Sequence, residues 1–378
     1  MISFDKLPVC YEGNKIYDIA YSTDFEGLKD FYDSYNPDHT KKLCIVSDTK
    51  VASFYLDAIL DVSENHFSKV VSYTFPEGEQ SKNLDTVRNL YVKLIEEHFD
   101  RNDVLLALGG GVTGDMCGFT AATYLRGIDF IQVPTSLLAD VDSSIGGKTG
   151  VDFEQYKNMV GAFHMPKLVY INISTLKSLD IRQFYSGMGE VVKSALIKKP
   201  DFYEWLETSI DKKCISSVDE AFSDDSLLHI ISECNKMKKE VVENDPHEKT
   251  GERALLNFGH TLGHALEKYM NFELLHGECV SIGCILATMI SRDKKILSQE
   301  KADRVISHIR NYYNLPKLPE DIDIDKIVEF THNDKKASGN IVKFILLRDI
   351  GDAFVSKEVT DIDKRKAFEE YLRVYNEG

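Results

Sequence analysis

The first half of the chain alternates short apolar runs with segments whose apolar residues recur at helical spacing. Leu84, Val87, Tyr91, Leu94 and Ile95 show this spacing directly after a polar loop. Strands that alternate with helices favour parallel pairing, so residues 1–174 are predicted to form a Rossmann-like, doubly wound α/β domain. The predicted strands are 42–47, 70–75, 104–108, 130–133 and 168–173.

After Thr175 long amphipathic patterns replace the strand-like runs, which predicts a second, mainly α-helical domain over 175–378. A late strand at 341–347 and a terminal helix after Asp361 complete this part. A cleft between two packed domains is the default position for a binding site. The predicted helices are 182–198, 227–242, 262–270, 280–295 and 301–313.

Composition narrows the class of protein. The 378 residues carry a formal net charge of −16, which argues against non-specific binding to nucleic acid or to an anionic membrane. The 7 cysteines form no CxxC pair, as expected of reduced thiols. The N-terminus lacks a basic region followed by an apolar stretch, so we expect a cytoplasmic globular protein without a secretory signal.

A glycine run at 109–114 directly follows a predicted strand, at the point where that strand would lead into a helix. Glycine lets the backbone approach a phosphate closely, and the helix N-terminus favours an anion. The spacing GGGxxGD is not the dinucleotide-binding GxGxxG, and a tight turn that needs small residues is the alternative. A second glycine-rich segment, 143–150, resembles the end of a P-loop but lacks its first glycine. Its Lys148 suits contact with a phosphate or, equally, is a solvated turn lysine.

Three histidines near one another suggest a metal or substrate site. His260 and His264 lie four residues apart, and His276 follows in Leu275-His-Gly-Glu278. The i,i+4 spacing can hold a divalent metal, but Thr261 stands where HExxH proteases have their glutamate. A buried structural role for the histidines is the alternative.

Glu190 and Lys193 lie three apart on one face of a helix among small and apolar residues. A surface ion pair is the ordinary explanation. A buried carboxylate would need a cation, and a metal shared with the histidines would supply one.

Taken together, the motifs resemble those of the 3-dehydroquinate synthase family, in order and spacing over most of the chain. The matching segments are PEGEQSK at 76–82, GGGVTGD at 109–115, YLRG at 124–127, VPTSLLADVDSSIGGKTGVD at 133–152, KNMVGAFHMP at 157–166, GMGEVVKSALI at 187–197, ALLNFGHTLGHALE at 254–267 and LHGE at 275–278.

The resemblance implies an NAD-binding first domain and a second domain that binds a divalent metal, zinc or cobalt. The family converts 3-deoxy-D-arabino-heptulosonate 7-phosphate to 3-dehydroquinate and phosphate in the shikimate pathway, by a lyase reaction in which NAD is regenerated. The resemblance also implies a homodimer, because Arg126 matches an arginine that reaches the neighbouring subunit's phosphate site. Glu190, His260 and His276 match the metal ligands.

Other site residues follow from the same resemblance. Asp142, Lys148, Lys193 and His264 are expected to take part in catalysis, and His264 to face the substrate phosphate. One extra residue in 245–253 leaves Lys238 and Lys239 as alternatives for one position. The expected substrate contacts are Arg126, Asp142, Lys148, Asn158, Lys193, Lys238, Arg253, Asn257, His264 and Lys335 or Lys336. The expected NAD contacts are Asp48, Glu79, Lys82, Gly111, Gly114, Asp115, Thr135, Ser136, Lys148, Lys157, Thr175 and Gln183.

Three other functions are compatible with parts of the pattern. Related cyclases act on sedoheptulose 7-phosphate or glucose 6-phosphate, but tend to change the GGK segment or the phosphate-side residues. A metal-dependent alcohol dehydrogenase would need no phosphate pocket and would consume NAD stoichiometrically. A binding protein without catalytic activity is disfavoured by the intact set of acids, lysines and histidines.

Overall fold

The computed structural model describes residues 6–154, 156–209, 217–218, 222–245, 248, 251–332 and 343–376. The chain divides into two compact units, residues 1–179 with 222–247 and residues 180–221 with 248–378. The first unit includes helix α8 (Asp224–Asn244), whereas the sequence placed that segment in the helical domain. Two side chains of α8 contact the rest of the first unit. Glu243 Oε1 accepts a hydrogen bond from the backbone amide of Cys10 at 2.5 Å, and Lys238 forms an ion pair with Asp142 at 2.7 Å.

The first unit is built on a seven-stranded sheet in the order β1-β2-β9-β6-β5-β3-β4. All its neighbouring strands pair in parallel except β1 and β2, which form an antiparallel hairpin at one edge. The five predicted strands are present, while the β1–β2 hairpin was not predicted. The strands are β1 (Leu7–Tyr11), β2 (Asn14–Ser22), β3 (Lys42–Asp48), β4 (Lys69–Phe75), β5 (Val104–Gly109), β6 (Asp129–Pro134) and β9 (Leu168–Asn172).

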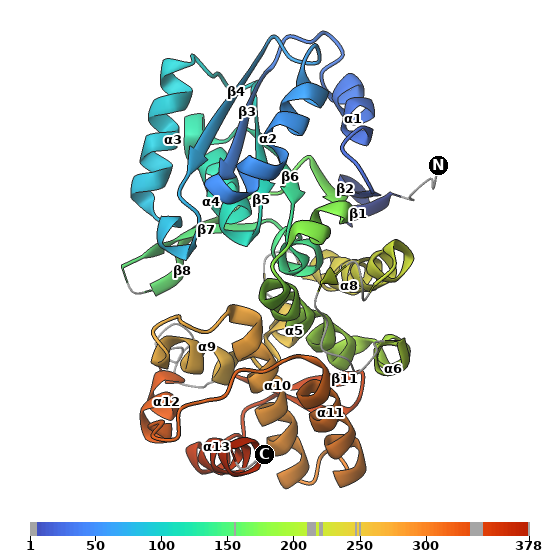
Figure 1. Cartoon of the computed structure of the whole chain (residues 1–378), viewed down its shortest axis with the longest axis vertical. Helices are drawn as coiled ribbons and strands as arrows, with labels where there is room; N and C mark the ends of the chain where they lie inside the picture. The colour runs from blue at the N-terminus through green and yellow to red at the C-terminus, as the bar shows by residue number, and fades with distance from the viewer. Residues whose placement is uncertain are drawn as a thin grey trace. The chain divides into compact units, whose positions relative to one another are not determined.

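Helices cover both faces of this sheet (Figure 1). Alternate residues of a strand point to opposite faces, and β5 shows the consequence. Leu105 packs with α3 (Leu84–Glu96) and α4 (Gly111–Thr123) in one core. Leu106 packs with α1 (Gly27–Tyr35) and α2 (Thr49–Ser63) in the other. The doubly wound α/β class predicted from the apolar pattern is therefore confirmed.

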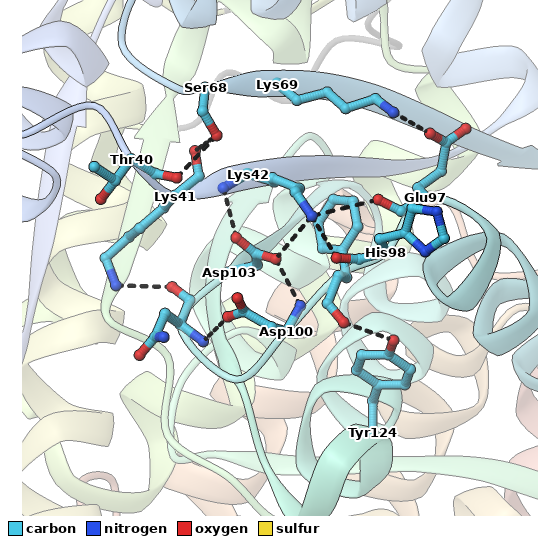
Figure 2. A network of polar contacts seen from close by, with 12 residues as sticks. Thr40, Lys41, Lys42, Ser68, Lys69, Glu97, His98, Asp100, Asp103 and Tyr124 are labelled. Carbon is cyan, nitrogen blue, oxygen red and sulfur yellow. Dashed lines mark hydrogen bonds and ion pairs between the residues drawn. The ribbon is translucent and has the colours of Figure 1, made fainter.

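A polar network joins the amino ends of three neighbouring strands, β4, β3 and β5 (Figure 2). The buried carboxylate of Asp103 accepts hydrogen bonds from the backbone amides of Lys42 and Asp100, both at 2.7 Å. Lys69 at the start of β4 pairs with Glu97 beyond α3 at 2.5 Å. The network lies at the opposite strand ends from the glycine run, so its role is structural.

The second unit is mainly helical and is centred on α10 (His276–Asp293), which is buried along most of its length. A hairpin of β10 (Phe344–Asp349) and β11 (Asp352–Ser356) overlaps the predicted late strand. In the described part of the chain, no helix is long and apolar enough to cross a membrane. The other helices of this unit are α5 (Ile181–Lys198), α6 (Pro200–Ser209), α9 (His260–Tyr269), α11 (Gln299–Tyr312), α12 (Ile324–Phe330) and α13 (Asp361–Asn376).

Glycines allow α10 to approach its neighbours backbone to backbone. A Cβ on Gly283 would lie 2.0 Å from the carbonyl oxygen of Gly259, just before α9. A Cβ on Gly277 would lie 1.7 Å from the carbonyl oxygen of Ser186 in α5. Larger residues would force the helices apart, so these two contacts determine how closely the side chains at the starts of α9 and α10 approach α5.

Candidate active site

Three helices of the second unit bring Glu190, His260 and His276 together. Glu190 lies in the middle of α5, while the two histidines are the first residues of α9 and α10. Oε1 of Glu190 is 3.5 Å from Nε2 of His260 and 3.4 Å from Nε2 of His276. One carboxylate oxygen and two imidazole nitrogens therefore face a common point.

The charged side chains next to this common point, Glu190 and Lys193, are buried. Lys193, one turn after Glu190 on α5, forms an ion pair with Oε2 of Glu190, and each side chain is 1% exposed. Burial raises the pKa of Glu190, but Lys193, His276 and His260 outweigh it and hold that pKa well below its usual range. Burial and Lys193 hold the pKa of His260 well below its ordinary value, so this ring is neutral.

The donor set fits a divalent metal. Both carboxylate oxygens of Glu190 are buried, and neither accepts a well-oriented hydrogen bond from the described residues. Nδ1 of His260 lies 3.2 Å from the carbonyl oxygen of Phe258. A proton held there leaves the Nε2 lone pair for a metal, as in many histidine ligands. One carboxylate with two imidazoles is a ligand set typical of catalytic zinc.

His264 lies beside this group on the exposed side of α9. The ligand nitrogens of His260, His264 and His276 come within 4.8 Å of one another, so geometry alone also admits His264 as a ligand. His264 differs from the other two in its exposure, which leaves it accessible to a substrate.

In the first unit, the predicted cofactor residues gather at the carboxyl ends of the strands. The chain runs outward from β3 to β4 and then crosses back to β5, so the strand order reverses between β3 and β5. Such a reversal is the usual ligand site of an open α/β sheet. Asp48 ends β3, where its Oδ1 caps α2 by accepting from the amides of Lys50 and Val51. Gly111 begins α4 directly after β5.

Lys82 connects several of the expected residues. Its Nζ donates to Asp115 Oδ2 and to Asn158 Oδ1, each at 2.6 Å. Burial lowers the pKa of Lys82, but Asp115 and Glu79 outweigh it and raise the pKa above its ordinary value. Lys157 lies 3.5 Å from Glu79 in an ion pair. The structure thus brings together residues that the resemblance assigned partly to NAD and partly to substrate.

Asp142 and Lys238 form a second polar group of the first unit. Asp142 belongs to a π-helical turn, Ala139–Ser143, and its Oδ1 is 2.7 Å from Nζ of Lys238. The neighbouring Lys239 instead pairs with Glu243 one turn along α8 at 2.8 Å. The geometry therefore favours Lys238 for the position that the sequence left open.

The remaining expected residues are placed as follows. Lys148 is exposed at the start of β7 (Lys148–Phe153), which pairs with β8 (Tyr156–Phe163), the strand that carries Asn158 and Lys157. Gln183 lies in α5 and so belongs to the second unit. Lys335 and Lys336 lie outside the described residues. Thr135 and Ser136 follow β6, Gly114 lies in α4, Thr175 follows β9, and Arg253 and Asn257 lie in the turn of 3-10 helix Arg253–Asn257.

Arg126 stands in a strained turn. Both Leu125 and Arg126 have positive φ, 49° and 68°, although neither is glycine. Such strain persists where the surrounding structure enforces it and is common at functional sites.

Asp140 and Glu267 are two buried acids that were not predicted from the sequence. Asp140 is 0% exposed in the same π-helical turn as Asp142, with no hydrogen-bond partner for its carboxyl oxygens among the described residues. Glu267 is 3% exposed on α9 and faces His276. Its position three residues after His264 was the available signal.

Fold and site together define a metal-dependent enzyme of the sugar phosphate cyclase type, and solved structures agree. The chain resembles 2-deoxy-scyllo-inosose synthase complexed with carbaglucose-6-phosphate, NAD+ and Co2+, at a TM-score of 0.85 and 26% identity over 97% of this chain and 99% of the other. The 2-epi-5-epi-valiolone synthase of Streptomyces hygroscopicus, with NAD+ and Zn2+ bound, gives the same TM-score and identity over 95% and 97%. An iron-containing alcohol dehydrogenase shares only the fold, at 15% identity and a TM-score of 0.59.

Sequence comparison is more specific. The family models for the 3-dehydroquinate synthase N-terminal and C-terminal regions match residues 72–186 and 187–337. The 3-dehydroquinate synthase of Acetivibrio thermocellus is 43% identical over 89% of this chain and 90% of that protein. That of Clostridium acetobutylicum is 40% identical over 88% and 90%. The chain belongs to the 3-dehydroquinate synthase family.

Proposed function

We propose that the chain converts 3-deoxy-D-arabino-heptulosonate 7-phosphate to 3-dehydroquinate and inorganic phosphate, with NAD and a divalent metal as cofactors. The observation that carries the proposal is the convergence of Glu190, His260 and His276 from three helices beside the buried Lys193. The family membership and the intact lysine set favour this substrate over those of the related cyclases.

Glu190, His260 and His276 would hold the metal. When bound, NAD would accept and return a hydride at a ring alcohol, while the metal would polarise that alcohol's oxygen. Lys193 balances the charge of Glu190, and the buried ion pair keeps the carboxylate ionised. Glu190 and Lys193 lie on one turn of α5, so the ammonium group of Lys193 is next to the residues that would hold the metal.

The carboxyl ends of β3, β5 and β6 would bind NAD. The start of α4 offers backbone amides to the pyrophosphate, and glycine at 110 and 111 permits the close approach. A Cβ on Gly111 would lie 3.0 Å from Ser143 Oγ, so little room remains there for a side chain. Lys82, with its raised pKa, stays cationic beside Asp115.

Lysine and arginine side chains would bind the anionic substrate despite the net charge of −16. Lys238, oriented by Asp142, and Lys148 are the candidates in the first unit. Arg253, Asn257 and His264 are the candidates in the second. His264 would contact the phosphate because it is exposed next to the proposed metal ligands.

We also propose a homodimer in which Arg126 contributes to the neighbouring subunit's phosphate site, as the resemblance of its segment YLRG to the family implies. The cytoplasm is the proposed location, since the cysteines among the described residues are free thiols.

One assay tests the reaction. Purified protein with NAD and Co2+ should release phosphate from the heptulosonate phosphate without net NADH accumulation. Stoichiometric NADH would contradict the proposal in favour of a dehydrogenase. Phosphate release only from sedoheptulose 7-phosphate would contradict it in favour of another cyclase.

A further inference from the structure

The imidazole of His276 lies between two carboxylates. Its Nε2 is 3.4 Å from Oε1 of Glu190, and its Nδ1 is 3.6 Å from Oε2 of Glu267. The second separation is an ion-pair distance, longer than a hydrogen bond. Glu267 comes from α9 and His276 from α10, so the contact joins the two helices that carry the proposed histidine ligands.

We propose that Glu267 is a positioning residue for the metal centre: its carboxylate, at ion-pair distance from Nδ1 of His276, keeps the ring proton on that nitrogen and thereby directs the Nε2 lone pair at the metal. This inference rests on the proposed function. A neutral imidazole ligates through one nitrogen while the other carries the proton, and the acceptor for that proton selects the tautomer and the ring orientation.

His260 provides an internal comparison. Its Nδ1 faces a backbone carbonyl, that of Phe258, at 3.2 Å. Both histidines thus present Nε2 to Glu190 and Nδ1 to an oxygen acceptor. The acceptor for His260 is main chain, whereas that for His276 is a side chain that substitution can remove.

The negative charge of Glu267 would also strengthen metal binding. Glu190, Lys193 and Glu267 are all buried, with residue exposures of 1%, 1% and 3%. Glu267 adds a second buried carboxylate beside His276, and an ionised carboxylate there would attract a divalent ion. In a poorly solvated site this attraction is larger than at the surface.

The test compares Glu267→Leu, which removes the acceptor, with Glu267→Gln, which keeps an acceptor oxygen but removes the charge. Lys268→Ala is the matched control, because it changes one charge on the same turn of α9, where Lys268 lies over the ring of Phe330 instead of facing His276. The dissociation constant for Co2+ is measured by chelator competition, the Co2+ d–d spectrum reports the ligand geometry, and urea unfolding of the metal-free protein reports stability.

We expect Glu267→Leu to weaken Co2+ binding about 10- to 100-fold, Glu267→Gln to weaken it less, and Lys268→Ala to leave it within twofold. The Co2+ spectrum should change in Glu267→Leu even at saturating metal. Unchanged affinity and spectrum in both Glu267 variants, with Co2+ bound by the unaltered protein, would overturn this inference alone. A loss of affinity matched by Lys268→Ala would overturn it as well. Failure of the unaltered protein to bind Co2+ would overturn the proposed function and the inference with it.

Discussion

Replacing Gly283 with alanine tests whether the close approach of α9 and α10 holds the two proposed histidine ligands in place. The new Cβ would lie 2.0 Å from the carbonyl oxygen of Gly259, where ordinary contacts begin at 3.4 Å. The two backbones must therefore separate by about 1.4 Å at this point, the difference between those distances. Gly259 directly precedes His260, so this ligand is displaced first.

Overpacking of this kind costs about 1–3 kcal/mol of the free energy of unfolding. A displaced ligand should also weaken metal binding by about 10- to 100-fold, the range seen when a ligand loses its orientation. Urea unfolding of the metal-free protein measures the first effect, and competition with a chelator for Zn2+ or Co2+ measures the second.

Ala287→Gly, on the same helix, is the control. It lowers stability by about 1–2 kcal/mol, through backbone entropy and the loss of one buried methyl group, without adding an atom. We expect it to keep the parent metal affinity. Gly283→Ala could instead unfold at the same urea concentration as the unaltered protein and bind metal as tightly. That result would show that the close approach of α9 and α10 does not position the histidines.

Four further substitutions test other parts of the structure. His276→Ala should abolish stoichiometric metal binding, whereas His264→Ala should keep the metal and raise the KM for the sugar phosphate. If metal analysis showed that His264→Ala loses the metal and His276→Ala keeps it, His264 and not His276 would be the metal ligand. Burial raises the pKa of Asp140 well above its usual range, so its contribution to stability is present below about pH 4 and is lost as the pH rises towards the folded-state pKa. Asp140→Asn should therefore reduce the fall in unfolding free energy between pH 5 and pH 7, by at most about 1.4 kcal/mol per pH unit, and an unchanged slope in urea titrations would contradict this. Asp103→Ala leaves two backbone amides without their acceptor and should cost about 2–4 kcal/mol with metal affinity unchanged, which the same two measurements check.

Much of the first unit follows from local pattern. Four of the five predicted strands, β3, β5, β6 and β9, lie inside the sheet and are buried on both faces, which makes their apolar runs continuous instead of alternating, while β4 is a partly exposed edge strand. The β1–β2 hairpin was missed because Asn14–Ser22 mixes exposed polar residues with buried ones at a sheet edge. Helix α8 was predicted as a helix, but amphipathic spacing says only that one face is buried and not against which partner.

The sequence by itself determined five strands of the first unit and the long helices that follow, the glycine run after β5 and, through its resemblance to a family, the candidate ligands. It left open whether His260, His264 and His276 serve a metal and whether Glu190 is a surface acid, because spacing along a helix does not report on other helices. Tertiary structure decided that Glu190 is buried with its oxygen 3.4–3.5 Å from two imidazoles, and that Glu267 lies behind one of them. The physical reason is that glycine contacts between distant segments bring α5, α9 and α10 within reach of one another, and such contacts exist only once the helices have packed.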